Sequence, residues 1–533
     1  MGSDVASRRR TPFRFPSRAP DTKHARSPYN RPVPETSFTE QDAILLEKMG
    51  GSTGGIAPER FQTAIEVLEE LTQLDVDHPD QVRMKAAFNR FNRAIRSERK
   101  RLEREPIETH DNGILSLTAT GSPERIDDET AGIPLVSHAP GAIAGILQEP
   151  RDCYICKGDY TQVDAFYHWL CPSCAAESHA KRDQHADLAG KRALLTGGRA
   201  KIGMYIALRL LRDGADLTIT TRFPHDAARR FSSLPDSADW IDRLSIVGID
   251  LRDPTQVVAL ADEVAAGGPL DILVNNAAQT VRRSPGAYSN LVEGEKTPLP
   301  GGIRLPKMLT FDRISEAHPA SLVGAGASLT GGLATQSAAD MTALALEAGN
   351  ASLERHLAGT AIDAGGLLPD LASVNSWTKT VDQVDPLEML EVQLCNATAP
   401  FILISRLRES MRASTARRKY VVNVSAMEGQ FGRRYKGAGH PHTNMAKAAL
   451  NMLTRTSAQE MFETDQILMT AVDTGWITDE RPHDQKLSIA AEGWHAPLDL
   501  VDGAARVYDP IVQGERGVDL YGVFLKDYKP FAW

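Results

Sequence analysis

Apolar residues follow two different periods along the chain. From Thr39 to Arg104 they recur every three or four residues. The stretch FQTAIEVLEELTQL places Phe61, Ile65, Leu68 and Leu71 on one stripe, as expected for one face of a helix. After Leu188 the apolar residues form short runs separated by helical stretches: 192–198, 216–222, 244–251, 271–278, 419–426, 467–475 and 518–525. Runs that are apolar on both faces predict an α/β fold, a doubly wound parallel sheet with helices on both sides.

The segment before the sheet divides into a tail, a helical region and a linker. Residues 1–37 are rich in Arg, Pro and Ser and predict a disordered tail. Residues 38–104 predict the helical region, with a second helix starting at Pro79, and residues 105–148 read as linker. In the second helix, Phe88, Phe91 and Ile95 predict a packed face opposite a charged one.

The basic end of this second helix, from Arg90 onward, has two interpretations. One is a nucleic-acid surface. The other, which we prefer, is the solvated outer face of a small helical domain that could bind a protein partner.

Composition narrows the class of protein. The chain has 533 residues and a net charge of −9, which gives no overall reason to expect a nucleic-acid partner. It contains no run of about 18 apolar residues, so we expect no membrane span. The start, MGSDVASRRRTPFRFPSRAP, has arginines without an apolar stretch and does not resemble a secretory signal. We expect a cytoplasmic protein.

Four of the five cysteines form two C-x-x-C pairs in residues 149–187. Cys153 and Cys156 are separated by fourteen residues from Cys171 and Cys174. Two such turns can complete a tetrahedron of thiolates around one ion, so the spacing predicts a zinc-ribbon-like module with structural Zn²⁺. Four protein ligands leave no position for a substrate water, so we expect no catalysis by this metal.

Five motifs follow in order after Leu188: LTGGRAKIG, NNAA, CNATAPF, NVSAMEG and TNMAK. Together they resemble the short-chain dehydrogenase/reductase family, over residues 188–533 apart from an insertion at about 285–374. The resemblance implies a Rossmann-like core that binds a pyridine dinucleotide. It also implies a small-molecule substrate and a homo-oligomer.

The segment TGGRAKIG follows the first strand and opens a helix. Its glycines let the backbone approach a pyrophosphate, and the helix N-terminus offers free amides. Lys201 stands at the family's usual middle glycine. Matching the motifs implies these coenzyme-binding residues: Gly197, Arg199, Lys201, Ile202, Gly203, Arg222, Asp250, Leu251, Asn276, Ala277, Lys447, Gly475 and Thr478.

Arg222 ends the second strand, where the family carries an acid for the ribose 2′-hydroxyl. An arginine there favours a 2′-phosphate, and hence NADP(H) over NAD(H). A surface arginine at a strand end is the alternative.

The family's chemistry uses a tyrosine, a lysine, a serine and an asparagine. Lys447 and Asn396 match, but Thr443 stands at the tyrosine position and Ala426 at the serine position. Ser425 is one residue away, and strand alternation points it to the other face. An aliphatic hydroxyl is too weak an acid to replace a phenol.

The long segment before Thr443 carries substitutes for the missing acid. His440, His442 and Tyr435 are candidates, since a histidine with a pKa near 6.5 can act as a general acid. The alternative is that His442 caps the helix and His440 is a surface residue.

Two functions remain. The first is an NADP(H)-dependent oxidoreductase with an atypical acid/base set, acting on a carbonyl, hydroxyl or related small molecule. The second is a catalytically reduced family member that binds NAD(P) as a scaffold or sensor, with the zinc ribbon and N-terminal helices binding a partner. The insertion, on the carboxyl side of the sheet, predicts a lid, a substrate domain or an oligomer contact.

Overall fold

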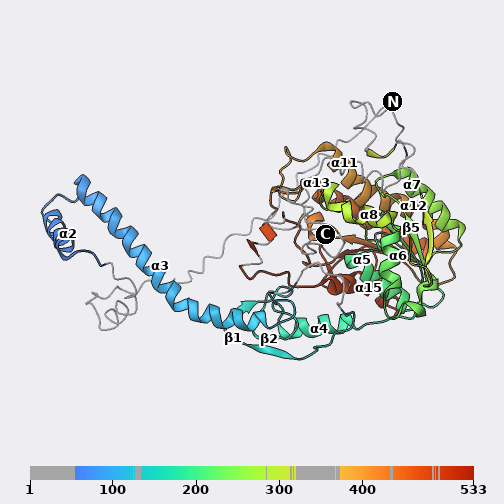
Figure 1. The fold of residues 1–533 in the computed structure, drawn as a ribbon, viewed down its shortest axis with the longest axis horizontal. Helices are drawn as coiled ribbons and strands as arrows, with labels where there is room; N and C mark the ends of the chain where they lie inside the picture. The colour runs from blue at the N-terminus through green and yellow to red at the C-terminus, as the bar shows by residue number, and fades with distance from the viewer. Residues whose placement is uncertain are drawn as a thin grey trace, which may run out of the picture. The chain divides into compact units, whose positions relative to one another are not determined.

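A computed structural model describes most of the chain (Figure 1). The described residues are 55–123, 125, 134–283, 285–311, 315, 317–319, 367, 373–432, 436–482, 485–486, 488–489 and 492–533. The chain divides into two compact units, residues 1–99 and 100–533. The predicted tail, 1–37, lies outside the described residues.

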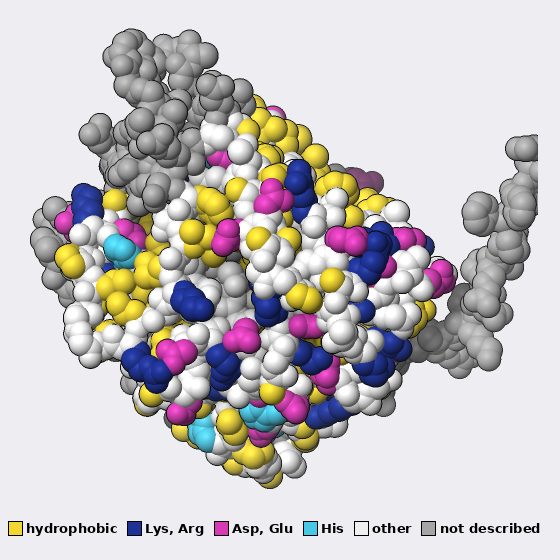
Figure 2. Space-filling view, turned by 90° about the vertical axis from the view of Figure 1, so that its right-hand side faces the viewer, with side chains coloured by type: hydrophobic (Ala, Val, Ile, Leu, Met, Phe, Trp, Pro, Cys, Tyr) yellow, Lys and Arg dark blue, Asp and Glu magenta, His cyan; other side chains and the backbone are white. Residues whose placement is uncertain are grey.

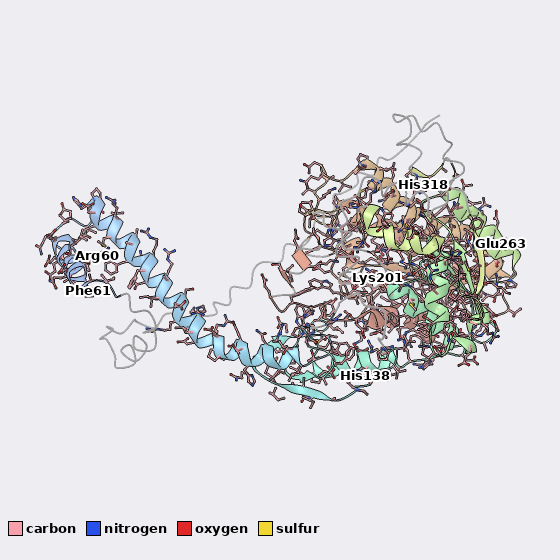
Figure 3. All side chains as sticks on the ribbon, in the orientation of Figure 1. Arg60, Phe61, His138, Lys201, Glu263 and His318 are labelled. Atoms are coloured by element: carbon pink, nitrogen blue, oxygen red, sulfur yellow. The ribbon has the colours of Figure 1, made fainter. Side chains whose placement is uncertain are left out.

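In the first unit the two predicted helices are present, with α2 at Pro58–Leu71 and α3 starting at Pro79. Leu71, Met84 and Ala87 line a shallow groove between them. The predicted packed face is wrong, because Phe88, Phe91 and Ile95 are all exposed. Phe61, labelled in Figure 3, is also exposed. Two helices can cover only one side of each other, so the remaining apolar positions stay at the surface of this unit.

The predicted linker is wrong at both of its ends. Helix α3 runs on through Pro106 to Ser116, and strand β1 (Ile143–Asp152) starts before residue 148. The Asp111 carboxylate near the end of α3 accepts hydrogen bonds from the Gln148 and Glu149 amides, at 2.8 and 3.2 Å. This buried contact fixes the end of α3 against β1.

Strand β1 pairs antiparallel with β2 (Asp159–Asp164), and helix α4 (Pro172–Arg182) follows. Aromatic residues surround the cysteines. Tyr160, Phe166 and Tyr167 are buried, and Tyr154 and Trp169 are half-buried. His168 and His179 are buried and hydrogen-bonded within this core, to Thr120 and to Asp164.

Among the described residues, nine strands form one sheet in the order β11-β10-β9-β8-β6-β3-β4-β5-β7. Every pairing in it is parallel except the final β10–β11 hairpin. The strands are β3 (Arg192–Leu195), β4 (Asp216–Thr221), β5 (Leu244–Gly248), β6 (Ile272–Asn275), β7 (Lys307–Thr310), β8 (Lys419–Ser425), β9 (Ile467–Asp473), β10 (Phe524–Lys526) and β11 (Lys529–Phe531). The run 518–525 was predicted as strand, but only its last residues pair.

Helices cover both faces of this sheet (Figure 1). One core packs α5 (Lys201–Arg212), α6 (Pro224–Ser232), α15 (Leu500–Glu515) and the cysteine module together. The other packs α7 (Pro254–Ala266), α12 (Ala399–Arg412) and α13 (Pro441–Asp465). The predicted doubly wound α/β fold is therefore confirmed. Short 3₁₀ turns at Ser237–Asp239 (η1), Ile241–Arg243 (η2) and Met427–Gly429 (η8) complete the connections.

The described part of the insertion joins the sheet. After η3 (Pro285–Tyr288) and α8 (Ser289–Lys296), β7 adds a parallel strand beside β5. Helix α8 packs beside α6. This strand was not predicted, because KMLT and its neighbours lack a long apolar run.

The helical stretch Pro386–Arg412 has the length and composition of a membrane span. It comprises α11 (Pro386–Gln393), one π-helical turn η7 (Leu394–Thr398) and α12. In this fold it connects the insertion to β8 and buries Leu403, Leu407 and Met411 in the second core. On the face shown in Figure 2, basic and acidic side chains are interleaved, and its described part presents no continuous basic surface.

Candidate functional site

The turn between β3 and α5 is built around glycines. Gly197 has φ of +71°, a conformation that only glycine adopts without strain. A Cβ on Gly203 would lie 1.9 Å from the Gly197 carbonyl oxygen, so this position has no space for a side chain. The Asn276 amide donates to the Thr196 and Gly197 carbonyls, both at 3.1 Å. The end of β6 thus holds the turn in a shape that leaves the α5 amides accessible.

Lys201, labelled in Figure 3, is the first residue of α5 and has φ of +53°. This explains why the family carries glycine there. A lysine in the left-handed region costs about 1 kcal/mol or more. In spite of this strain, the position carries a lysine, which places a cation beside the turn.

A cavity of about 400 Å³ opens at the carboxyl ends of β3, β4, β5 and β6. The structure brings together nearly all of the coenzyme-binding residues expected from the sequence. The lining includes Gly197, Arg199, Lys201, Ile202, Gly203, Arg222, Asp250, Leu251, Asn276, Ala277 and Thr478. Gly475 and Lys447 do not line it directly, although Gly475 has φ of +79° two residues before Ile477, which does.

Arg222 lies beside two aromatic rings that stack on each other, those of Phe223 and Tyr288, whose centres are 6.1 Å apart. Its guanidinium is 5.0 Å from the Tyr288 ring centre and 5.6 Å from that of Phe223, and it donates to the Tyr288 hydroxyl at 3.4 Å. Aromatic faces attract the cation and restrict its rotamers. Tyr288 comes from the insertion, and the sequence analysis missed it because nothing in PGAY marks it as part of the site.

Asp250 and its neighbours form a buried ion-pair network. Arg252 binds both Asp250 oxygens and also the Glu391 carboxylate of α11, at 2.9 Å. His318 Nε2 lies 3.3 Å from the Asp250 carboxylate. Although burial opposes ionisation, Arg252 and His318 hold the pKa of Asp250 well below its usual value. Asp250 therefore remains a carboxylate, and it also orients Arg252 in the cavity wall. Sequence reasoning missed Arg252 and Glu391.

Lys447 is buried on α13, and its ammonium donates to the Val424 carbonyl at 2.8 Å. Burial lowers the pKa of Lys447 to about 8, and the nearby Glu428 carboxylate opposes this shift. Cys395 itself lines the cavity. Lys447 thus lies behind the cavity wall with a pKa near physiological pH.

Asn396 lies in the π-helical turn, and its amide exchanges two hydrogen bonds with the backbone of Gln279, at 2.7 and 2.9 Å. Gln279 and Thr280 line the cavity. A π-turn inserted in a helix is frequent at functional sites. Asn396 here holds the cavity wall after β6 in place.

The two hydroxyl groups near the missing tyrosine and serine differ in position. Thr443 is buried and donates weakly, at 3.4 Å, to the carbonyl of cavity-lining Thr280. The Ser425 hydroxyl donates to Asn451 Oδ1 of α13 at 2.5 Å. Ser425 therefore points toward α13, the helix that also carries Thr443 and Lys447.

Neither candidate histidine lines the cavity. His440 is the residue before α13, and its ring stacks on Trp377 with ring centres 3.9 Å apart. His442 is buried, and among the described residues its ring nitrogens have no hydrogen-bond partner; Glu388 is 4.0 Å away. Burial lowers the pKa of His442, which favours the neutral ring. The alternative that His442 caps the helix is wrong, because His440 holds the cap position without a side-chain bond. Tyr435 lies outside the described residues.

Arg282 and Arg283 diverge after β6. Arg282 packs toward Glu391, 3.6 Å away, whereas Arg283 lines the cavity with its guanidinium 4.0 Å from Glu480. Of the pair, Arg283 is thus the one that lines the cavity.

The four cysteines of the module converge. The Sγ atoms of Cys153, Cys156, Cys171 and Cys174 all lie within 4.8 Å of one another. The Cys171 amide donates to Cys153 Sγ at 3.3 Å, the type of contact that stabilises a thiolate. Four thiols that point at one centre are a donor set suited to tetrahedral Zn²⁺.

Comparison with known proteins agrees with the fold and the glycine turn. The family model for short chain dehydrogenase matches residues 191–292. Uncharacterized protein R665 of Acanthamoeba polyphaga mimivirus is 30% identical over 374 residues, which cover 68% of this chain and 71% of that protein. A peroxisomal 2,4-dienoyl-CoA reductase of Danio rerio is 29% identical over 177 residues, covering 32% of this chain and 56% of the reductase.

A solved structure is similar over the same core. A short chain dehydrogenase from Burkholderia cenocepacia, crystallised in complex with NADP, covers 64% of this chain and 97% of its own, with 20% identity and a TM-score of 0.39. The doubly wound sheet with its glycine turn defines a nucleotide-binding α/β protein. The family model, over residues 191–292, assigns this part of the sheet domain to the short-chain dehydrogenase/reductase family.

Proposed function

We propose that this protein is an NADP(H)-dependent oxidoreductase, which transfers hydride between the nicotinamide and a small carbonyl, hydroxyl or related compound. The observation that carries the proposal is the cavity beside the glycine turn. Its wall combines the N-terminal residues of α5, a turn with no room for side chains, and the cations Arg199, Lys201, Arg222, Arg252 and Arg283. Such a wall suits a ligand with several phosphates.

The preference for a 2′-phosphate follows from Arg222 and its surroundings. A planar guanidinium held beside the rings of Phe223 and Tyr288 can bind a phosphate through two hydrogen bonds. Arg199, which is 2.5 Å from Asp226, lies on the same side of the cavity. In this arrangement NADP(H) gains a charge-assisted contact that NAD(H) lacks.

The acid/base set is centred on Lys447. When bound, the coenzyme supplies or accepts the hydride, and one proton must travel with it to or from the substrate. With a pKa lowered to about 8, Lys447 can release this proton near neutrality and take it back in the reverse direction. Thr443 keeps a hydroxyl at the tyrosine position, through which a proton can pass without the residue itself ionising.

We also propose that the four-cysteine module holds structural Zn²⁺. The convergence of four thiol groups supports it, since four thiolates at these distances repel one another unless a cation balances their charge.

Titration with coenzyme tests the first part. NADPH should bind the full-length protein more tightly than NADH when followed by nicotinamide fluorescence. Arg222→Leu should weaken NADPH binding about 10- to 100-fold and NADH binding far less, as expected for a lost charged hydrogen bond. Arg212→Leu, which removes an arginine paired with Asp236 away from the cavity, is the matched control. Equal loss for both coenzymes would contradict the 2′-phosphate assignment.

Turnover tests the second part. A panel of carbonyl compounds, extended to α,β-unsaturated thioesters because some relatives are named dienoyl-CoA reductases, should reveal NADPH oxidation. The reduction rate should fall above pH 8 as Lys447 loses its proton, and Lys447→Met should abolish turnover. Tight NADPH binding without turnover on any substrate would instead favour the scaffold or sensor.

A further inference from the structure

The cysteine module contacts the connection between β9 and α15, whose residues Ile477, Thr478 and Glu480 line the coenzyme cavity. Tyr154 lies inside the first C-x-x-C turn, between Cys153 and Cys156. Its hydroxyl oxygen accepts a hydrogen bond from the Trp476 amide at 2.9 Å. Trp476 directly precedes Ile477. One metal-binding turn therefore contacts the backbone next to the cavity wall.

The second C-x-x-C turn leads to the other end of the same connection. Cys171 and Cys174 start helix α4, which packs beside α15 (Figure 1) and whose last residue is Arg182. The buried Arg182 guanidinium donates to Asp499 at 2.7 Å. Asp499 caps α15, one residue before the cavity-lining Leu500.

Two further contacts reinforce this second end. The Tyr167 hydroxyl donates to Asp502 in the first turn of α15 at 2.6 Å. Arg125, which precedes the module, donates to the Ala496 and Leu498 carbonyls, both at 2.5 Å. The two ends also meet directly, since the rings of Trp476 and Trp494 lie 4.7 Å apart.

We propose that the metal-bound four-cysteine module is a clamp that fixes both ends of the β9–α15 connection, with Tyr154 as a positioning residue for the coenzyme site. The inference rests on the proposed function. Each pair of cysteines is continuous in sequence with one anchor, so a shared ion ties the Tyr154 anchor to the Arg182 anchor. Loss of the ion frees the turns to move apart, and the affinity for coenzyme falls.

The test compares Tyr154→Phe with Tyr160→Phe in the full-length, metal-loaded protein. Both changes remove one phenolic hydroxyl from the same module, but the Tyr160 hydroxyl donates inside it, to the His168 carbonyl at 2.8 Å. Tyr154→Phe should raise the Kd for NADPH about 2- to 10-fold, as expected for one lost neutral hydrogen bond. Hydrogen exchange should rise in residues 474–482 while the zinc content stays the same. Tyr160→Phe should leave both the Kd and the exchange of 474–482 unchanged.

Removal of metal with a chelator is the second arm. Exchange should rise at residues 474–482 and 494–500, with 216–221 of β4 as the internal reference, and the Kd should rise at least as much as in Tyr154→Phe. Three results would each overturn the clamp. The first is an equal Kd and equal exchange in metal-loaded and chelated protein. The others are equal effects of the two tyrosine variants and a module that takes up no zinc. If the parent protein binds neither coenzyme, the proposed function is wrong. If the parent binds NADPH, the proposed function stands and these comparisons test only the clamp.

Discussion

Lys447 gives a prediction whose size and pH dependence follow from its burial. Inside the fold its pKa is about 8, compared with 10.5 for an ordinary lysine. The folded protein therefore binds fewer protons than the unfolded chain between these values, and the burial of the charge destabilises it below them. At 1.36 kcal/mol for each pKa unit, the penalty at pH 7 is about 3 kcal/mol.

Lys447→Met removes the charge and keeps most of the side-chain volume. It also removes the hydrogen bond to the Val424 carbonyl, which contributes about 1 kcal/mol. The variant should therefore be more stable than the parent by about 2 kcal/mol at pH 7. The sign of the pH dependence is fixed. Stability of the parent rises with pH through the interval from 8 to 10.5, so the penalty falls to about 1.4 kcal/mol at pH 9.5 and the two proteins become nearly equal.

Urea unfolding followed by tryptophan fluorescence at pH 7, 8 and 9.5 measures this difference. Lys307→Met, which changes an exposed lysine on β7, is the control and should give the same difference at each pH. A Lys447→Met protein that is less stable than the parent at pH 7, or a difference that does not change with pH, would refute the reasoning from burial.

Three other changes test the glycine turn, the docking of the module and its metal. Gly203→Ala should abolish NADPH binding and lower the free energy of unfolding by about 1–3 kcal/mol, because its Cβ would overlap the Gly197 carbonyl. The control is Gly113→Ala at an exposed position of α3, where a Cβ would have no atom nearby, and it should retain binding. Arg182→Met should lower the free energy of unfolding by about 3–5 kcal/mol by leaving two buried carboxylates unpaired, whereas Lys529→Met at an exposed pair should change it by less than about 0.5 kcal/mol. Chelation of metal should lower the melting temperature seen by calorimetry, and an unchanged melting profile would argue against structural zinc.

The local part of the site could be predicted from the sequence because its geometry is set within a few residues. TGGRAKIG indicates a strand–turn–helix unit whatever surrounds it, since the glycines answer a backbone requirement. The C-x-x-C spacing likewise fixes which thiols can share an ion. The position of Arg222 at the end of a strand also predicted that it lies at the cavity, because the carboxyl ends of parallel strands lie on one edge of the sheet.

Predictions that depended on distant partners were less successful. His440 and His442 are near Lys447 in sequence, but Trp377 and Glu388 from the segment before α12 determine where their rings lie. The apolar stripe on α3 has the period of a packed face, yet period alone does not supply a partner to pack against. Tyr288 lines the cavity from the insertion, far along the chain from the glycine turn.

The sequence by itself determined the order of the strands' apolar runs, the glycine turn, the four-cysteine set and the loss of the tyrosine and serine, because each is a property of neighbouring residues. Only the tertiary structure decided that Arg222 is held beside the Tyr288 ring, that Lys447 is desolvated, and that Tyr154 reaches Trp476. These features depend on groups far apart in the chain. Their interaction energies arise from burial and from contacts that form only when helices pack on both faces of the sheet.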